Sequence, residues 1–318
     1  MHSPDVIGLG ALNIDHLHQV ERILLDGEAP LEGHVSAPGG SAANTIYALA
    51  KLGVEAGFVG AVGDDEVGRM LAQDLASVGV DIGQIKVKRD APTGSVLCLS
   101  DRRGRRALYA SPGANSLLGR EDIELARIKA RIVHLSSFVH QGQLELTIDL
   151  LGELAPTSKV SFAPGALYAA RGLQALAPIF KRTDILFVNR DELRQLTGQD
   201  FSPGARSLLE QGCHTVVVTM GGGKKRGTTP ACYVLSGEKA YLVEPQRAGT
   251  EMVEATGAGD AFAAGFLYGL IEGKGPEECG FLGDIVAGFS MSRLGARAGL
   301  PTQAQLSQRY RELYGKPL

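Results

Sequence analysis

The sequence predicts a doubly wound α/β fold, in which helices cover both faces of a mostly parallel sheet, and three observations support this prediction. Short β-branched apolar runs alternate with amphipathic helical patterns along the chain. Such alternation is typical of right-handed βαβ units, which build parallel sheets. The apolar runs are continuous, as expected of strands that are buried on both faces. Gly accounts for 42 of the 318 residues, which indicates many tight turns and close backbone approaches.

The individual strands and helices can be placed from these patterns. The apolar runs that predict strands are residues 6–9, 57–59, 132–135, 160–162, 185–188 and 215–219. Helical spacing relates Ile46 to Leu49 and Ala50, Val67 to Met70, Leu71 and Leu75, and Leu144 to Ile148 and Leu151.

Residues 14–37 and 92–111 interrupt the alternation, because strand patterns follow one another there without helices. We predict that these two stretches form one small β-sheet lid over the site. No linker or break in composition divides the chain, so we predict a single domain over residues 1–318 into which the lid is inserted discontinuously. A cluster of arginines surrounds the turn of the second stretch, and we interpret it as a solvated hairpin tip, with a grip on an anion as the alternative. The cluster consists of Arg102, Arg103, Arg105 and Arg106.

The composition excludes several classes of function. A net charge of -3 and a sequence pI near 6.2 do not indicate the clustered basic face that binds nucleic acids. No apolar run approaches the roughly 20 residues that a membrane-spanning helix needs. The scattered cysteines contain no C-x-x-C pair, which argues against a zinc site or a disulfide framework and for a reducing compartment. We therefore expect a cytoplasmic protein that binds neither nucleic acid nor membrane.

The segment at residues 254–266 carries the strongest chemical signal. Gly257, Ala258 and Gly259 lead into an alanine-rich helix, and the amides at a helix start are unsatisfied and carry partial positive charge. Small residues let an anion approach these amides, so the segment predicts an anion hole for a phosphoryl group in transfer. Asp260, in the first helical turn, is placed to accept the proton of an attacking hydroxyl. On this segment alone, an ordinary first-turn acid is an equal alternative.

Asn13 and Asp15 follow the first apolar run and alternate along an extended segment, so both can face one side. The carboxyl end of the first strand of an α/β sheet is where ligands bind, and together these side chains can hold vicinal hydroxyls. Gly8 and Gly10 also begin a dinucleotide-binding pattern. Because Asn13 replaces the third glycine of that pattern, a dinucleotide-dependent oxidoreductase is disfavoured.

Gly39 and Gly40 precede a predicted helix whose first turn contains Asn44. We expect the glycines to let a polyhydroxylated ligand touch the backbone, while the Asn44 amide donates and accepts hydrogen bonds. The alternative is a loop–helix junction that is capped by Ser41.

Two later strand ends predict the nucleotide side of the site. Asn189 and Glu192 follow an apolar run and suit hydrated Mg²⁺ near phosphates, with an ordinary helix start as the alternative. Thr219 and Gly221 open a glycine-rich turn that can lie along the phosphates of a nucleotide. This turn is not a P-loop, because Thr228 stands where that motif requires its lysine.

Taken together and in this order, these segments resemble the ribokinase-like (PfkB-type) family of sugar and nucleoside kinases, from about Val6 to Pro301. The combination is far more specific than any single motif, and it favours a catalytic role for Asp260. The motifs that carry the resemblance are Asn13-Ile14-Asp15-His16, Gly39-Gly40 with Asn44, Ser111-Pro112-Gly113-Ala114-Asn115, Asn189 with Glu192, Thr219 with Gly221, Gly257-Ala258-Gly259-Asp260 and Arg293-Leu294-Gly295-Ala296.

The resemblance implies a role for each matched residue, as well as a homodimer that assembles through the β lid. The residues expected to bind the acceptor are Asn13, Asp15, Gly39, Gly40, Asn44 and Asn115. Those expected to bind ATP are Asn189, Glu192, Thr219, Gly221, Gly257 and Gly259, with Mg²⁺ held near Asn189 and Glu192 through water and phosphate. Catalysis falls to Asp260 with the anion hole at Gly257, Ala258 and Gly259.

The departures from the family pattern bear on the ions and the acceptor. Glu254 replaces the usual aspartate, and Gly299 replaces a serine of ribokinase, so a monovalent-cation site is doubtful and we predict weak or absent potassium dependence. Ser41 replaces a lysine of ribokinase, which leaves the identity of the acceptor open. Residues 13–15 and 39–44 contain no Lys or Arg, so we expect an acceptor that is not already phosphorylated.

These observations predict an ATP-dependent kinase that transfers the γ-phosphoryl group to a hydroxymethyl group of a sugar or sugar-like acceptor. A nucleoside kinase of the same family is the alternative within this class. A non-catalytic nucleotide or sugar sensor is the alternative of another class, against which the complete Gly257-Ala258-Gly259-Asp260 motif argues, since a sensor need not retain it.

Overall fold

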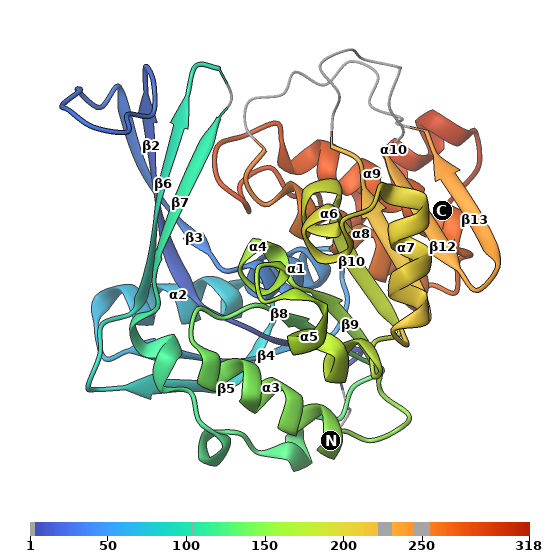
Figure 1. The fold of residues 1–318 in the computed structure, drawn as a ribbon, viewed down its shortest axis with the longest axis horizontal. Coiled ribbons are helices and arrows are strands. Elements are labelled where there is room, and N and C mark those ends of the chain that lie inside the picture. Colours follow the sequence, from blue (N-terminus) through green and yellow to red (C-terminus); the bar gives the residue numbers. More distant parts are fainter. Residues whose placement is uncertain (1–3, 104, 222–230, 245–254) are drawn as a thin grey trace.

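A computed structural model describes residues 4–103, 105–221, 231–244 and 255–318. In this part of the chain a nine-stranded sheet has the strand order β13-β12-β11-β10-β9-β8-β1-β4-β5. A separate four-stranded sheet, the lid, has the order β3-β2-β6-β7 and rises from one side of the large sheet (Figure 1). Residues 222–230, which include Thr228, and residues 245–254, which include Glu254, lie outside the described residues.

The strands and helices of both sheets have well-defined bounds. The strands of the large sheet are β1 (Val6–Leu9), β4 (Ala56–Gly63), β5 (Asp81–Lys88), β8 (Ile132–Ser136), β9 (Lys159–Ala163), β10 (Ile185–Asn189), β11 (Thr215–Thr219), β12 (Cys232–Ser236) and β13 (Lys239–Val243). The lid strands are β2 (Asn13–Val20), β3 (Gly33–Gly39), β6 (Gly94–Asp101) and β7 (Arg106–Ser111). The helices are α1 (Ser41–Lys51), α2 (Glu66–Ser77), α3 (Gln141–Glu153), α4 (Gly165–Ala169), α5 (Gly172–Phe180), α6 (Arg190–Thr197), α7 (Phe201–Glu210), α8 (Ala258–Ile271), α9 (Pro276–Ser290) and α10 (Gln303–Tyr314).

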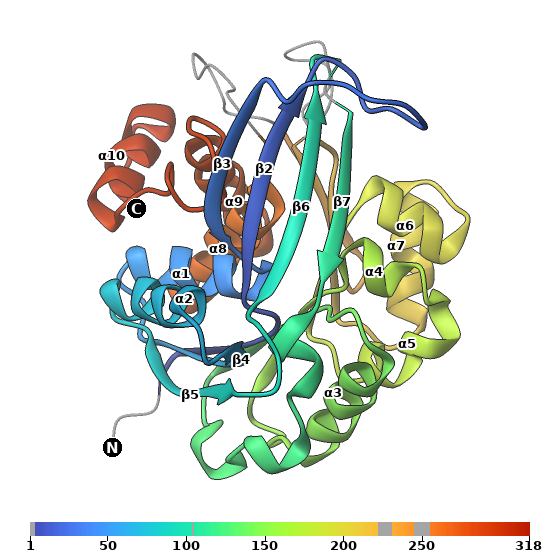
Figure 2. The ribbon, with the colours of Figure 1, turned by 90° about the vertical axis from the view of Figure 1, so that its left-hand side faces the viewer.

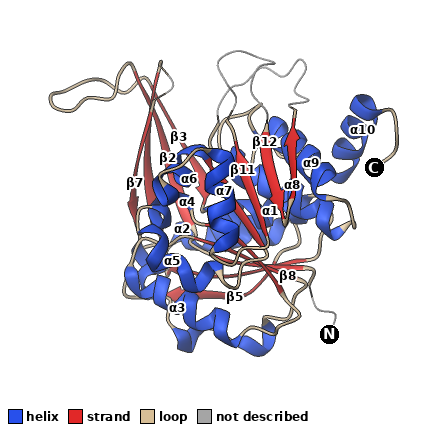
Figure 3. Cartoon of the chain, turned by 45° about the vertical axis from the view of Figure 1, so that its right-hand side comes forward, coloured by secondary structure: helices blue, strands red, loops and turns tan. Residues whose placement is uncertain are grey.

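The large sheet has helices on both faces, as predicted (Figure 3). The strands from β5 to β11 in the sheet order pair in parallel, and β12 is antiparallel to both of its neighbours. Successive valines of β11 show why the apolar runs are continuous: Val217 belongs to the core with α1, α8 and α9, whereas Val216 and Val218 belong to the core with α3, α5 and α6. All three side chains are fully buried. The doubly wound α/β prediction is therefore confirmed.

The strand order reverses at β1, which lies between β4 and β8. From β1 the chain builds β4 and β5 on one side and β8 to β11 on the other. Ligands of doubly wound sheets bind at such a switch point, outside the carboxyl ends of the strands. The first lid strand, β2, begins at Asn13 just beyond the end of β1, so the lid starts at this position.

The lid consists of two antiparallel pairs, β2 with β3 and β6 with β7, joined by a parallel pairing of β2 with β6 (Figure 2). The predicted strand stretches at residues 14–37 and 92–111 thus pair with each other. Paired residues share one face of a sheet, and alternate residues along a strand share it too. The register therefore places Asp15, Leu17 and Gln19 on one face of the lid and His16 and His18 on the other. Within the described residues, no helix combines the length and apolar character needed to cross a bilayer.

Candidate active site

Asp260 lies in the first turn of α8, and its carboxylate faces the N-terminal end of α1. Its Oδ1 accepts a hydrogen bond of 2.6 Å from the Ser41 hydroxyl, and its Oδ2 accepts one of 2.9 Å from Nδ2 of Asn44. Burial raises the pKa of Asp260 to about 6, against the opposing effects of these hydrogen bonds and of the Arg297 charge. A carboxylate with this pKa is ionised at neutral pH and is still basic enough to take a proton from a hydroxyl.

The predicted anion hole lies at the start of α8. Gly257 is the N-cap residue with φ 75°, and a side chain there would collide with Ala296, so glycine is required on both counts. Gly259 has open space where a side chain would stand, and it lines a cavity. The Ala258 amide donates to the carbonyl oxygen of Ala255 at 3.2 Å, which leaves the following amides of the first turn for an anion.

Gly39 and Gly40 make room for protein atoms at the turn into α1. A side chain at Gly39 would collide with the Asp15 carboxylate, so this carboxylate lies directly against the Gly39 backbone. Gly40 has φ 98°, and a side chain there would collide with the carbonyl oxygen of Ala11. The glycine pair therefore fixes the Asp15 carboxylate and the turn into α1.

Asn13 and Asn115 form one hydrogen-bonded unit at the base of the lid. Nδ2 of Asn115 donates to Oδ1 of Asn13 at 2.9 Å and to the carbonyl oxygens of Leu12 and Pro112 at 3.0 Å each. Its Oδ1 accepts the Leu12 amide at 2.9 Å. Asn115 is buried, and these partners occupy both ends of its amide. Asn115 thus ties Asn13, at the start of the lid, to the loop that follows β7.

The predicted nucleotide residues stand at neighbouring strand ends. Asn189 ends β10 and pairs directly with Thr219 at the end of β11, and Gly221 follows with φ 69°. Asn189 and Glu192 form a reciprocal capping box: Oδ1 of Asn189 accepts the Glu192 amide at 2.8 Å, and Oε2 of Glu192 accepts the Asn189 amide at 3.0 Å. Burial raises the pKa of Glu192, and the nearby negative charge of Asp260 raises it further. Glu192 at the start of α6 and Asp260 at the start of α8 are thus close enough for their charges to interact.

The contacts that Ser41, Asp74 and Arg297 make in the site were not predicted. The N-cap of α1 is Gly40, without a side-chain hydrogen bond, so Ser41 is not the cap that the sequence offered as an alternative, and its hydroxyl binds Asp260 instead. Arg297 is buried and donates to Oδ1 of Asn44 at 2.9 Å and to Oδ2 of Asp74 at 2.5 Å. Arg297 directly follows the Arg293-Leu294-Gly295-Ala296 motif, but nothing in the sequence signals its burial.

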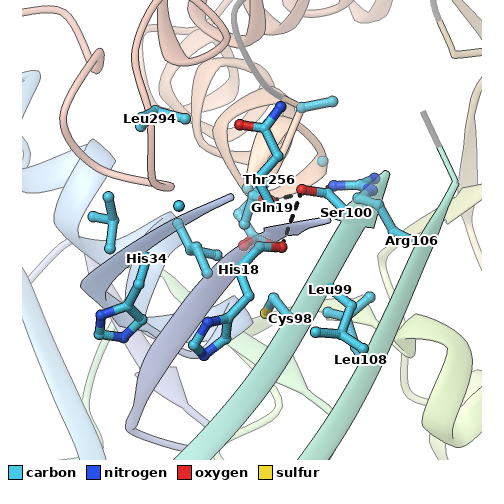
Figure 4. A pocket seen from close by; sticks show the side chains of 17 residues that line it. His18, Gln19, His34, Cys98, Leu99, Ser100, Arg106, Leu108, Thr256 and Leu294 are labelled. Carbon is cyan, nitrogen blue, oxygen red and sulfur yellow. Dashed lines mark hydrogen bonds between the residues drawn. The ribbon is translucent and has the colours of Figure 1, made fainter. Parts of the chain in front are cut away.

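A cavity of about 640 Å³ lies between the lid and the start of α8 (Figure 4). Its wall on the α8 side contains Thr256, Gly257, Gly259 and Asp260, with Leu294 beside them. Its lid wall includes two cross-strand rows, and His18, His34 and Leu99 of the lid also line the cavity (Figure 4). The apolar row is Leu17, Val35, Cys98 and Leu108, and the polar row beyond it is Gln19, Gly33, Ser100 and Arg106.

The arginine cluster of the lid turn is largely paired within the lid. Arg102 contacts Glu32 at 2.6 Å, and Arg105 contacts Asp101 at 2.7 Å. Arg106 differs, because it donates to the Thr256 hydroxyl at 3.3 Å across the cavity mouth. The lid edge thus contacts the chain just before α8.

The model of the pfkB family carbohydrate kinases matches residues 3–303. The chain belongs to this family. It is accordingly a phosphotransferase with an alcohol group as acceptor, which confirms the predicted family and enzyme class.

Curated pfkB relatives match over most of the chain. An "uncharacterized sugar kinase" of Archaeoglobus fulgidus is 35% identical over 254 residues, which cover 80% of this chain and 98% of the relative. The "ATP-dependent ribose-1-phosphate kinase" of Halopiger xanaduensis is 32% identical over 318 residues, which cover 96% of this chain and 99% of the relative.

Solved structures show that the fold is that of ribokinase. The nucleoside kinase of Methanocaldococcus jannaschii superposes with a TM-score of 0.82 at 23% identity, over 98% of this chain and 100% of that one. The ribokinase of Arabidopsis thaliana, solved with ribose and ATP, superposes with a TM-score of 0.82 at 24% identity, over 97% of this chain and 99% of that one.

Proposed function

We propose that this pfkB kinase transfers the γ-phosphoryl group of ATP to a hydroxymethyl group of a sugar-like acceptor, with Asp260 as the general base. The observation that carries the proposal is the position of its carboxylate. It is held by Ser41 and Asn44 beside the start of α8 and opens onto the cavity beneath the lid. A base and an anion hole in the same helical turn are what an in-line attack on a phosphoryl group requires.

In the proposed reaction the acceptor oxygen attacks the γ-phosphorus while its proton passes to Asp260. The bond between the γ-phosphorus and the bridging oxygen breaks, and ADP leaves with the electron pair of that bond. Free amides at the start of α8 stabilise the charge on the phosphoryl oxygens. Asn13 and Asp15 hold other hydroxyls of the acceptor, and the lid above them excludes water.

ATP brings Mg²⁺ to such a site, and its surroundings fit an ion that is held through phosphate and water. Asn189 and Glu192 satisfy each other's backbone amides in the capping box, which leaves them little freedom to act as direct ligands. Within the described residues, no three His, Cys, Asp or Glu side chains converge as a metal-binding group. Mg²⁺ would neutralise phosphate charge there, while the protein supplies the oriented carboxylate near it.

The lid wall of the cavity favours a nucleoside as a second candidate acceptor. Strands rise about 3.3 Å per residue. The row of Leu17 therefore lies roughly 7 Å from the row of Asp15, and the row of Gln19 lies roughly 13 Å from the row of Asp15. A sugar held at Asp15 ends near the apolar row. A planar base on that sugar would cover Leu17 and Leu108 and bring its polar edge to Gln19.

A phosphorylated sugar fits this wall less well, because a phosphate attached to the sugar ring would meet the apolar row. Because the Halopiger relative is named a ribose-1-phosphate kinase, ribose 1-phosphate is included among the acceptors to be tested. Arg106 donates to the Thr256 hydroxyl and stands in the row of Gln19 and Ser100, beyond the apolar row as seen from Asp15.

The experiment that tests the acceptor is a panel of ribose, fructose, inosine, adenosine, ribose 1-phosphate and fructose 6-phosphate with MgATP, with ADP release as the readout. We expect turnover with an unphosphorylated sugar or a nucleoside. Preference for either phosphorylated sugar would contradict the proposed acceptor class, and the absence of ADP release with every alcohol would contradict the reaction.

We also propose a cytoplasmic homodimer that assembles through the lid. Leu97 and Tyr109 are direct cross-strand partners on the lid face that carries His16 and His18. They are 40% and 62% exposed and adjoin each other, so they form an apolar patch that a second lid could cover. Sedimentation should give twice the mass of one chain, and Tyr109→Glu should reduce it to that of a monomer.

A further inference from the structure

Arg297 lies between α9 and α10 and has only 6% of its surface exposed. Its guanidinium donates to Oδ1 of Asn44 at 2.9 Å, to Oδ2 of Asp74 at 2.5 Å and to the carbonyl oxygen of Gly39 at 3.1 Å. A buried cation is tolerated when it is paired and hydrogen-bonded, and these acceptors meet that condition. Arg297 therefore links α1, α2 and the glycine turn of the acceptor side.

The bond from Arg297 determines which end of the Asn44 amide faces the base. A guanidinium only donates hydrogen bonds, so it can bond to the Oδ1 oxygen of Asn44 but not to its amino group. With Oδ1 held by Arg297, Nδ2 points the other way and donates to Oδ2 of Asp260 at 2.9 Å. A flipped amide would set two donors against each other at Arg297 and two acceptors against each other at Asp260.

We propose that Arg297 is a positioning residue for phosphoryl transfer: it orients the Asn44 amide, and through Asn44 it holds the Asp260 carboxylate in place for the acceptor hydroxyl. The proposal rests on the proposed role of Asp260 as the base. The same guanidinium holds the carbonyl of Gly39, against whose backbone the Asp15 carboxylate lies. One buried side chain thus sets both the base and the acceptor contact.

The charge of Arg297 acts in the same direction as its geometry. It favours the ionised form of Asp260 and so lowers the pKa of this carboxyl, whereas burial raises it. Asp74 balances the charge of Arg297 from α2. Among the described residues, other titratable side chains that act on this pair are Asp15 on β2, Tyr47 on α1 and Glu192 on α6.

Three substitutions separate the orientation effect from the charge effect. Arg297→Met removes both, so we expect kcat to fall on the order of 10²-fold and the acidic limb of kcat/KM to move up by about one pH unit. Arg297→Lys keeps the charge but cannot reach all three acceptors, so the limb should stay near its original pH while kcat remains low. Asp74→Asn leaves the guanidinium charge unbalanced while keeping an acceptor oxygen, so the limb should move to lower pH.

The opposite signs for Arg297→Met and Asp74→Asn are the critical result, because a purely structural role would not move the limb in opposite directions. The measurements are kcat and kcat/KM against pH, with ADP affinity and the melting temperature as checks that each variant is folded. Arg120→Met is the matched control, because it removes an arginine from an exposed ion pair with Glu153. We expect its pH profile to equal that of the unmodified protein.

An acidic limb that stays in place in both Arg297→Met and Asp74→Asn would overturn the proposal. If Arg297→Met does not fold, the other two variants test the proposal. An acidic limb that is unchanged in Asp74→Asn, together with a normal kcat in Arg297→Lys, would overturn it. Asp260→Asn keeps the two proposals apart. Normal turnover in Asp260→Asn would contradict the role of Asp260 as the base. If Asp260→Asn is inactive but the acidic limb is unchanged in Arg297→Met and Asp74→Asn, only the role of Arg297 is contradicted.

Discussion

The hydroxyl of Ser41 donates a hydrogen bond of 2.6 Å to Oδ1 of Asp260, although the two residues are 219 positions apart in the sequence. This bond joins the start of α1 to the first turn of α8. Since hydrogen bonds to the charged form of a carboxyl favour that form, Ser41 helps to keep Asp260 ionised in a site where burial raises its pKa to about 6.

Ser41→Ala should therefore move the acidic limb of kcat/KM upward from about pH 6. Activity is lost as the pH falls through the pKa of Asp260, because the protonated carboxyl cannot accept the acceptor proton. A hydrogen bond to a charged group contributes about 1.5–3 kcal/mol, so the shift should be roughly one to two pH units. Ser41→Thr keeps the hydroxyl and serves as the control, and a limb unmoved in Ser41→Ala would refute the contribution of this bond.

Asp15→Asn should weaken acceptor binding much more than ATP binding. The Asp15 carboxylate lies against Gly39 at the base of the lid, and the amide keeps its shape while losing its charge. The loss of a charged hydrogen bond predicts an increase in acceptor KM on the order of 10- to 100-fold, with ATP KM nearly constant. Asp64→Asn, at an exposed ion pair with Arg69, is the control. A change confined to ATP KM would mean that Asp15 serves the other substrate.

Leu108→Ser should separate the two candidate acceptors. Leu108 lines the cavity, whereas its neighbour Tyr109 points to the opposite face of the lid, and the two are 61% and 62% exposed. For a nucleoside acceptor, the loss of this apolar contact should raise KM on the order of tenfold, while KM for ribose should stay constant.

Tyr109→Ser is the matched control for Leu108→Ser, and its kinetics should be unchanged when they are measured on material of the same oligomeric state. If Leu108→Ser also leaves nucleoside KM unchanged, the apolar row does not bind a base and the sugar remains the better candidate.

Potassium should activate the enzyme weakly or not at all. A side chain at Gly299 would collide with the carbonyl oxygen of Phe289, so no hydroxyl can be supplied from this position to an ion. The test compares turnover in potassium chloride with turnover in a tetramethylammonium salt at equal ionic strength, since screening alone alters charged-ligand binding. Activation by potassium of tenfold or more, about 1.4 kcal/mol in the barrier, would show that a cation site exists despite Gly299.

The sequence predicts those features that local patterns determine. The run at residues 215–219 is identifiable as a buried strand because each of its valines is apolar, and the structure buries Val216, Val217 and Val218 completely. Asp260 is identifiable because its glycine-rich surroundings and its place in a helical turn are both local. The pairing of the two lid stretches follows from their lack of helices.

The remaining features depend on partners that are distant in the sequence. In the sequence, Arg297 is indistinguishable from a surface arginine. Only the packing of α1 and α2 around it makes it a buried donor to Asn44 and Asp74. The Asn115 amide binds Leu12 and Asn13, which are 103 and 102 positions away, so no local pattern reveals these partners. The contact between the Asp15 carboxylate and the Gly39 backbone likewise arises only when β2 pairs with β3.

The most direct test of the central claim is single-turnover phosphoryl transfer by Asp260→Asn, with ADP affinity measured on the same preparation. Positioned acid–base catalysis contributes roughly 10²–10⁴-fold, so we expect the transfer rate to fall by that factor while ADP affinity and the melting temperature are retained. A transfer rate within a few-fold of the unmodified enzyme would contradict the assignment of Asp260 as the base.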